Sequence, residues 1–407
     1  MDDSKAMLRR AQGCLYGQLI GDALGARYEF KSDSQVAAMV AEDREKSGFL
    51  PILGGGPFFM QPGQVTDDSE MALSLARSLV DLKKFSAPDI AASYVAWIQS
   101  NPPDRGITTE HALLGRGEYK KVGPDFRSAL SKKEKEALWE EVKKRVHERN
   151  TNSLSNGALM RISPLGIATT RWSDERRIRR CVDEDVGMTH CHDLVKETVF
   201  AFVMAIRSLI KGESVEDAFN AALNSVHSPW AQACILDAKK HANPVKLTDG
   251  REIYGDKEKI GFIGVALQGA FYELLHARTF AEGVERTVLR GGDTDTNGCI
   301  AAALLGARFG KEGIPEDWKK SVRNAKPRDR AYSYLKTIGG LDVRLVMLIR
   351  RHHRVYIYSS RGLRGLLRSA QSVPLMLSSV MPTQIHHREN IYGTNGRCSL
   401  PNLHLTQ

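Results

Sequence analysis

The chain has 407 residues, of which 42% are hydrophobic and 26% are charged. This composition is typical of a globular protein and excludes a disordered or fibrous one, and the length allows a substantial buried core. The formal net charge is +10, yet residues 343–407 contain nine Arg, one Glu and neither Lys nor Asp. Residues 1–342 are therefore close to neutral, and we expect no nucleic-acid binding by this part of the chain.

The cysteines and the apolar segments indicate in which cellular compartment the protein is expected. Six cysteines are scattered, and no two form a CxxC pair, so reduced thiols are expected rather than a disulfide framework or a zinc site. The chain begins with Met1, Asp2 and Asp3 and shows no signal-peptide pattern. The longest apolar stretches carry charges or are too short to cross a bilayer. We expect a soluble, cytoplasmic monomer that does not contact membranes.

The first predicted helix, over residues 11–26, carries an unusual glycine stripe. Glycines recur at every fourth position, so that they share one helical face; they are Gly13, Gly17, Gly21 and Gly25. Each glycine in a helix interior costs about 1 kcal/mol relative to alanine. Four of them on one face indicate that another element, or a ligand, approaches the backbone closely.

Helical patterns continue along most of the chain. A glycine-rich loop at residues 54–57 precedes an apolar stripe of helical spacing within 63–82. Ser86–Asp89 resembles a capping box that opens a helix through Trp97. Further helices are predicted over residues 131–149, 193–211, 215–226, 260–277 and 296–309. Strand-like alternation is scarce, so the predicted fold class is all-α.

The segment from residue 343 differs from the rest. Lys disappears, Arg, His and Ser become frequent, and helical periodicity is hard to follow. We interpret residues 343–407 as an appended basic tail without a folded function, either poorly ordered or unrelated to the preceding part. The alternative is a basic arm that binds nucleic acid or acidic membranes. The predicted boundary therefore separates a domain over 1–342 from this tail.

Two acidic clusters carry the strongest chemical signal. Thr66, Asp67 and Asp68 lie where a loop becomes a helix, and the run Gly291–Gly298, GGDTDTNG, also precedes a helix. Carboxylates, hydroxyls and carbonyls are the oxygen ligands that hard cations such as Mg²⁺, Mn²⁺ and Ca²⁺ prefer. The flanking glycines allow the backbone to bend around an ion. We predict that the two clusters meet in one metal site.

Each acidic residue also has an ordinary structural interpretation. Acidic residues such as Asp67 and Asp68 are favoured at helix N-termini by the exposed N–H groups. An EF-hand needs Glu at its twelfth position, which counted from Asp293 is Leu304, so that type of site is excluded. Asp22 is a further candidate ligand, or else a buried residue paired with a backbone N–H or an Arg. Glu29 by itself could be a surface acid.

Five motifs, in this order, resemble the ADP-ribosylglycohydrolase family. They lie between about residues 8 and 325 and include GQLIGDALGARYEF, GGGPF…PGQVTDDSEMALSLARSL, SNGALMRISPLGI, MTHCHD and GGDTDTNGCIAAALLGARFG. The resemblance is closest to bacterial members, like the dinitrogenase reductase activating glycohydrolases, that remove ADP-ribose from arginine. It implies an all-helical fold over 1–342 with two Mg²⁺ or Mn²⁺ ions in a cleft.

The resemblance also implies roles for individual residues. The metal ligands of the family match two short segments, namely Thr66, Asp67 and Asp68 in the first and Asp293, Asp295 and Thr296 in the second. Glu29 matches an acidic residue near the metals, and we expect the catalytic carboxylates to be Asp67, Asp68 and Glu29. The ADP-ribose contacts match Ser155, Asn156, Gly157 and His190. For His190 the alternative is a histidine that caps a helix.

The resemblance has one departure, at Ile107, where some arginine-specific relatives carry an acidic or amide residue. An apolar side chain cannot contact a guanidinium, so the acceptor stays open. The expected reaction is metal-dependent removal of ADP-ribose from an ADP-ribosylated protein, from arginine first and serine second. Two alternatives are a non-catalytic protein of the same fold that binds metal or ADP-ribose, and a metal-dependent phosphohydrolase that cleaves the pyrophosphate.

Overall fold

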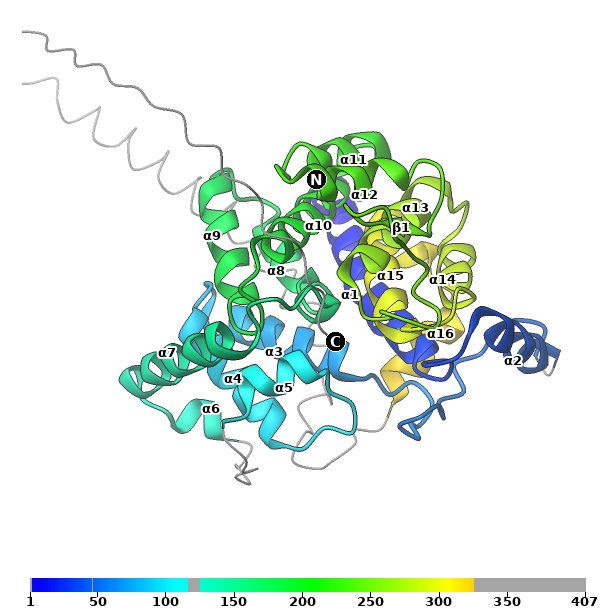
Figure 1. Ribbon diagram of the computed structural model, residues 1–407. Coiled ribbons are helices and arrows are strands. Elements are labelled where there is room, and N and C mark those ends of the chain that lie inside the picture. The colour runs from blue at the N-terminus through cyan, green and yellow to red at the C-terminus, as the bar shows by residue number, and fades with distance from the viewer. Residues whose placement is uncertain (1, 46, 116–124, 326–407) are drawn as a thin grey trace, which may run out of the picture. The chain divides into compact units, whose positions relative to one another are not determined.

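The computed structural model describes residues 2–45, 47–115 and 125–325 (Figure 1). Within them the fold is all-α, as predicted, with a two-stranded antiparallel pair that aligns Val245 with Ile253. The elements are α1 (Asp2–Gly25), α2 (Asp33–Glu45), α3 (Asp67–Leu82), α4 (Ala87–Gln99), α5 (Ile107–Leu113), α6 (Phe126–Ala129), α7 (Lys132–Arg149), η1 (Asn156–Ala158), α8 (Ser163–Thr169), α9 (Glu175–Val186), α10 (Asp193–Lys211), α11 (Val215–Leu223), α12 (Pro229–Asp237), β1 (Val245–Lys246), β2 (Glu252–Ile253), α13 (Ile263–His276), α14 (Phe280–Val288), α15 (Thr294–Phe309), η2 (Lys311–Gly313) and α16 (Glu316–Asn324).

Helices α1 and α15 lie side by side in the core and run antiparallel (Figure 1). Their contact is made by backbone, because every glycine of the α1 stripe faces a carbonyl of α15. A Cβ atom would lie 2.2 Å from the Gly306 oxygen at Gly13, 2.0 Å from the Ala302 oxygen at Gly17, 2.1 Å from the Gly298 oxygen at Gly21 and 2.2 Å from the Thr294 oxygen at Gly25. The glycine stripe therefore serves close helix packing, and its last member reaches the first turn of α15.

The helices predicted from the sequence are present, and most of their ends lie within a few residues of the prediction. Residues 193–211 form α10 as predicted, whereas α13 begins at Ile263 and α11 ends at Leu223, each three residues inside its prediction. Helix α1 begins nine residues earlier than predicted, at Asp2. The predicted capping box at Ser86 is wrong, because the Ser86 side chain makes no cap hydrogen bond. Asp89 instead turns inward to Ser78, Arg127 and Lys135.

No helix in the described ranges is long and apolar enough to cross a membrane. The tail predicted over 343–407, and the boundary that separates it from 1–342, lie outside the described residues. Both remain predictions.

Alanine at Gly17 should destabilise the protein. The new Cβ would lie 2.0 Å from the carbonyl oxygen of Ala302, so α1 and α15 must separate, and we expect the free energy of unfolding to fall by about 1–3 kcal/mol in urea denaturation. Gly269→Ala in α13 is the matched control, because the nearest atom to its Cβ is 4.0 Å away. Equal stability of the two variants would contradict the close packing.

Candidate metal centre

The turn after α1 brings Glu29 to the start of α15. The N–H of Phe30 donates to the carbonyl of Gly292 over 2.9 Å, and the N–H of Gly292 donates to the carbonyl of Lys31 over 2.8 Å. Gly292 has a φ of +74°, and a Cβ there would lie 1.8 Å from the carbonyl oxygen of Gly255. Only glycine fits this position. The two backbone hydrogen bonds thus hold Phe30 and Lys31 against Gly292, just before α15. Glu29, the residue before Phe30, is thereby placed next to the start of α15.

The first acidic cluster is fixed by Asp22. This buried carboxylate accepts hydrogen bonds from the N–H groups of Thr66 (2.9 Å) and Ser69 (3.0 Å), and from the Thr66 hydroxyl. The Thr66 hydroxyl lies within 2.8 Å of Asp68 Oδ2 as well. Asp22 therefore has the structural role that the sequence left open, pairing with backbone N–H groups. It anchors the N-terminus of α3 to α1.

The second acidic cluster lies at the N-terminus of α15. The Thr294 hydroxyl donates to the carbonyl of Gly25 over 2.7 Å, which ties this cluster directly to the end of α1. Asn156 donates to Asp293 Oδ2 over 2.8 Å. The carboxylates of Asp293 and Asp295 are buried, as is Thr296. The sequence placed Asn156 in a ligand-contacting loop, and the structure gives it a hydrogen bond to a predicted metal ligand.

A third segment contributes an acid that the sequence analysis missed. Ligand oxygens of Glu29, Asp104 and Asp295 all lie within 4.8 Å of one another. The loop that carries Asp104 is held at the site by the N–H of Gly106, which donates to Asp67 Oδ2 over 3.3 Å. No spacing in the sequence singles out Asp104, because it is a lone acid after two prolines. Its proximity to the other acids depends on how the loop before α5 folds back.

The acids from all these segments lie close enough to repel one another. Burial, then Asp293 and Asp67, raise the pKa of Glu29 to about 9. Burial and then Asp293 raise the pKa of Asp67 to about 6. Burial, with Glu29 and Asp68 next, holds the pKa of Asp295 well above its usual range. Acids separated by more than two hundred residues in the chain therefore form one cluster.

The donor set of this cluster fits hard cations. Glu29 Oε2 and Asp68 Oδ1 are buried and have no hydrogen-bond partner among the described residues, and an unpaired buried carboxylate oxygen is costly. The chief charge effects on the pKa values of Glu29, Asp67 and Asp295 come from other carboxylates. Divalent cations would supply both the missing ligands and the missing positive charge. The acidic cluster is thus a candidate metal centre.

The predicted substrate residues lie beside the acidic cluster. Ser155 Oγ is 2.8 Å from His190 Nε2, and Asn156, the next residue, bonds Asp293. His190 is buried between Ser155 and the hydroxyl of Thr189. The helix-capping interpretation of His190 is wrong, because the N-cap of α10 is His192, whose Nδ1 accepts from the N–H of Leu194.

Ile107 lies next to the loop that joins the acidic cluster. It is the first residue of α5, and its side chain is 73% exposed. The preceding residue, Gly106, donates its N–H to Asp67. An apolar, exposed side chain therefore lies next to the acidic cluster. It occupies the position where some arginine-specific relatives carry an acidic or amide residue.

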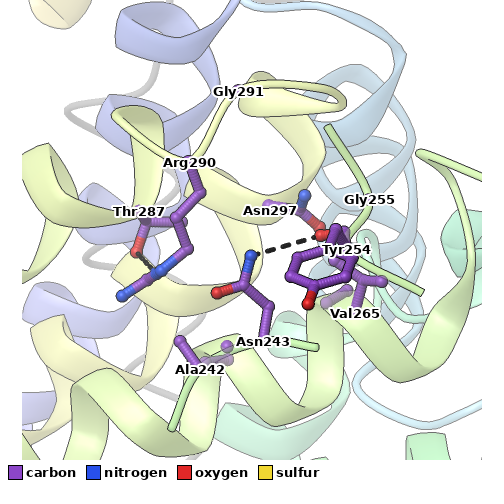
Figure 2. Close-up of a pocket in the computed structure, with 12 residues that line it drawn as sticks. Ala242, Asn243, Tyr254, Gly255, Val265, Thr287, Arg290, Gly291 and Asn297 are labelled. Atoms are coloured by element: carbon purple, nitrogen blue, oxygen red, sulfur yellow. Dashed lines mark hydrogen bonds between the residues drawn. The ribbon is translucent and has the colours of Figure 1, made fainter. Parts of the chain in front are cut away.

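A separate small cavity lies between α13, the start of α15 and the segments of Asn243 and Tyr254 (Figure 2). None of the residues that line it is acidic. Its one cationic side chain, Arg290, forms an ion pair with the buried Glu273. This cavity lacks the groups that hydrolysis needs and is not the candidate site.

Comparison with known proteins agrees with this geometry. The family model for ADP-ribosylglycohydrolase matches residues 3–353. The chain therefore belongs to the ADP-ribosylglycohydrolase family, and it is a hydrolase. The match extends past residue 342, the boundary predicted from composition, into residues that the structure does not describe.

Several curated relatives have similar identities. The ADP-ribosyl-(dinitrogen reductase) glycohydrolase of Rhodospirillum rubrum is 27% identical over 82% of this chain and 97% of its own length. The ADP-ribosylhydrolase ARH3 of Xenopus tropicalis is 27% identical over 79% of this chain and 93% of its own. The ADP-ribosylarginine hydrolase Tri1 of Pseudomonas putida is 24% identical over 77% and 74%. These values do not single out the bacterial subgroup that the motifs resemble.

A solved structure supports the fold. A chain of an ADP-ribosylglycohydrolase-related protein complex superposes with a TM-score of 0.59 and 22% identity, over 85% of this chain and 99% of its own. The all-α fold of the described residues is thus the fold of a known relative.

Cation binding should stabilise the protein. Mg²⁺ or Mn²⁺ at about one hundred times its Kd should add about 2.7 kcal/mol to the free energy of unfolding, because the cation relieves repulsion among buried carboxylates. Differential scanning fluorimetry would record this as a rise in Tm. This rise in Tm should shrink as the pH falls from 8 towards 5. The pKa values of Glu29 and Asp67 are raised, so over this range protons compete with the cations for the carboxylates.

Two variants control this measurement. Asp295→Asn should remove most of the rise in Tm, whereas Asp249→Asn, in a loop where Asp249 pairs with Arg251, should keep it. An unaltered protein whose Tm responds to neither cation at pH 8 would contradict the metal centre.

Proposed function

We propose that the protein hydrolyses the glycosidic bond between ADP-ribose and a protein side chain, with arginine as the first acceptor and serine as the second. The observation that carries the proposal is the convergence of carboxylates from the end of α1, the start of α3, the loop before α5 and the start of α15. Relatives named for ADP-ribosyl-dinitrogen reductase and for ADP-ribosylarginine support the substrate class.

The candidate ligands of two Mg²⁺ or Mn²⁺ ions are the six residues predicted from the sequence. They are Thr66, Asp67, Asp68, Asp293, Asp295 and Thr296, to which the structure adds Asp104 as a neighbouring carboxylate. When bound, such a pair of cations holds ribose hydroxyls and orients water. Asp22 and Asn156 position this set through their hydrogen bonds to Thr66 and Asp293.

The protein's own carboxylates would move the protons. As the bond from the anomeric carbon to the acceptor nitrogen or oxygen breaks, a bond forms from that carbon to water; the water loses a proton and the departing group gains one. We assign this transfer to Asp67 in preference to Asp68, because Asp67 keeps 6% of its surface exposed and Asp68 keeps none. Glu29, also 6% exposed, is the second carboxylate. The acids also oppose the positive charge that develops on the ribose.

The ADP-ribose moiety would lie against the segment Ser155, Asn156 and Gly157, which borders the acidic cluster, and the fully buried His190 would support it from behind Ser155. The acceptor side chain would leave past Ile107, whose exposed, apolar side chain offers no partner to a guanidinium.

Removing the two adjacent acids should abolish hydrolysis. Asp67→Asn with Asp68→Asn should lower the rate of ADP-ribose release by at least about 10²-fold, because proton transfer of this kind contributes about 10²–10⁴-fold. Release would be followed from peptides that carry ADP-ribose on arginine or on serine, with Mg²⁺ present. Arginine peptides should react faster than serine peptides.

The matched control is Asp81→Asn, an acid of the same helix that is 52% exposed and pairs with Arg127; it should leave the rate unchanged. Full release by the double variant would overturn the assignment. The products separate the alternatives: intact ADP-ribose supports the glycohydrolase, AMP indicates a phosphohydrolase, and tight binding without turnover indicates a non-catalytic protein.

A further inference from the structure

A chain of hydrogen bonds connects the buried core to the loop beside the acidic cluster. Arg161 Nη1 lies 2.8 Å from Thr189 Oγ1, which lies 2.8 Å from His190 Nδ1, and His190 Nε2 lies 2.8 Å from Ser155 Oγ. The first three of these side chains are fully buried, and Ser155 is partly exposed. The chain of hydrogen bonds therefore ends at a side chain that solvent reaches.

The donor and the acceptor of each of these hydrogen bonds can be assigned by starting from Arg161, the buried end. Arginine has donors and no acceptor, so Thr189 Oγ1 accepts from Arg161. The single proton of the Thr189 hydroxyl then needs an acceptor, and His190 Nδ1 is within reach. If Nδ1 carried a proton and donated instead, the hydroxyl proton of Thr189 would be buried without a partner among the described residues. Nδ1 is therefore the acceptor.

The remaining proton of His190 sits on Nε2. Burial, then the positive charge of Arg161, lower the pKa of His190 to about 3, so the ring is neutral and carries one proton. That proton is donated to Ser155 Oγ. The Ser153 hydroxyl also donates to Ser155, over 3.4 Å. Ser155 accepts both hydrogen bonds, and among the described residues it donates none, so its own proton is available to a ligand.

Arg161 is itself held rigidly. Asp185 accepts from Arg161 Nε over 3.2 Å and from the hydroxyl of Tyr94 over 2.9 Å, and the backbone carbonyl of Asp185 accepts from Arg161 Nη2. Arg161 Nη1 also donates to the carbonyl of Gly157 over 3.0 Å. One buried guanidinium thus fixes both the loop that contains Ser155 and the hydroxyl that orients His190.

We propose that Arg161 and Thr189 are positioning residues that hold His190 as its Nε2–H tautomer, so that Ser155 donates its hydroxyl proton to an acceptor oxygen of the ADP-ribose moiety. The inference rests on the proposed function for the identity of the ligand. The assigned tautomer of His190 depends only on hydrogen bonds within the protein, not on the ligand. The site selects an oxygen that accepts, such as a phosphate oxygen, over a group that donates.

The tautomer is measured directly by ¹⁵N NMR of histidine-labelled protein, with the His190 signals assigned by their loss in His190→Asn. In the unaltered protein Nδ1 should have the shift of an unprotonated nitrogen and Nε2 that of a protonated one. In Thr189→Val the proton should redistribute between the two nitrogens, and in Thr189→Ser the original pattern should return. A protonated Nδ1 in the unaltered protein would overturn the inference, whatever the variants do.

The consequence for binding is measured by calorimetry with free ADP-ribose and Mg²⁺. Thr189→Val should raise the Kd roughly three- to tenfold, the value of one hydrogen bond, and Thr189→Ser should restore it. Thr198→Val is the matched control, because within the described part of the chain this buried hydroxyl of α10 bonds only to the carbonyl of Leu194. The Kd of this variant for ADP-ribose should not change.

The outcomes separate this inference from the proposed function. If the unaltered protein binds ADP-ribose and Thr189→Val binds it equally well, the positioning role is wrong and the proposed function stands. If the unaltered protein does not bind ADP-ribose, the proposed function fails, and with it the ligand named here; the NMR spectrum still decides the tautomer.

Discussion

The site depends on the backbone contact between α1 and α15. Because the glycine stripe admits the carbonyls of α15 at distances that no Cβ allows, the end of α1 reaches the beginning of α15. There Thr294 bonds to Gly25, and Phe30 and Lys31 bond to Gly292. Asp22, on the same α1, draws in the start of α3. One helix thus positions Glu29 and both acidic clusters.

The same arrangement creates an electrostatic cost that a metal centre would remove. Packing the helices this closely buries the carboxylates, and burial is the first cause of every raised pKa in the cluster. Like charges a few ångströms apart raise the values further. A fold that concentrates acids in this way is stable with cations bound or with several acids protonated.

The sequence predicted the helical fold, the glycine stripe and both acidic clusters, because helix periodicity and the D-T-D-T run are local patterns. It left the role of Asp22 open and missed Asp104, because their partners are set by how distant segments meet. Asp22 needed the position of α3, and Asp104 needed the path of the loop before α5. Likewise, the motif that contains His190 carried no sign of Arg161 as its support, since Arg161 lies in the turn before α8 and is 28 residues away from its partner Thr189 in the chain. The convergence of the two acidic clusters was predictable from their residue types and the family resemblance, whereas the individual partners of Asp22, Asp104 and His190 were not.

The central claim is that acids from the starts of α3 and α15 bind common cations. Anomalous diffraction from crystals grown with Mn²⁺ tests it most directly. The account predicts manganese peaks between these two helix N-termini, with protein oxygen ligands from Asp67 or Asp68 on one side and from Asp293 or Asp295 on the other. Peaks ligated by one of the two segments alone, or no peak at this place in crystals that hold manganese elsewhere, would contradict it.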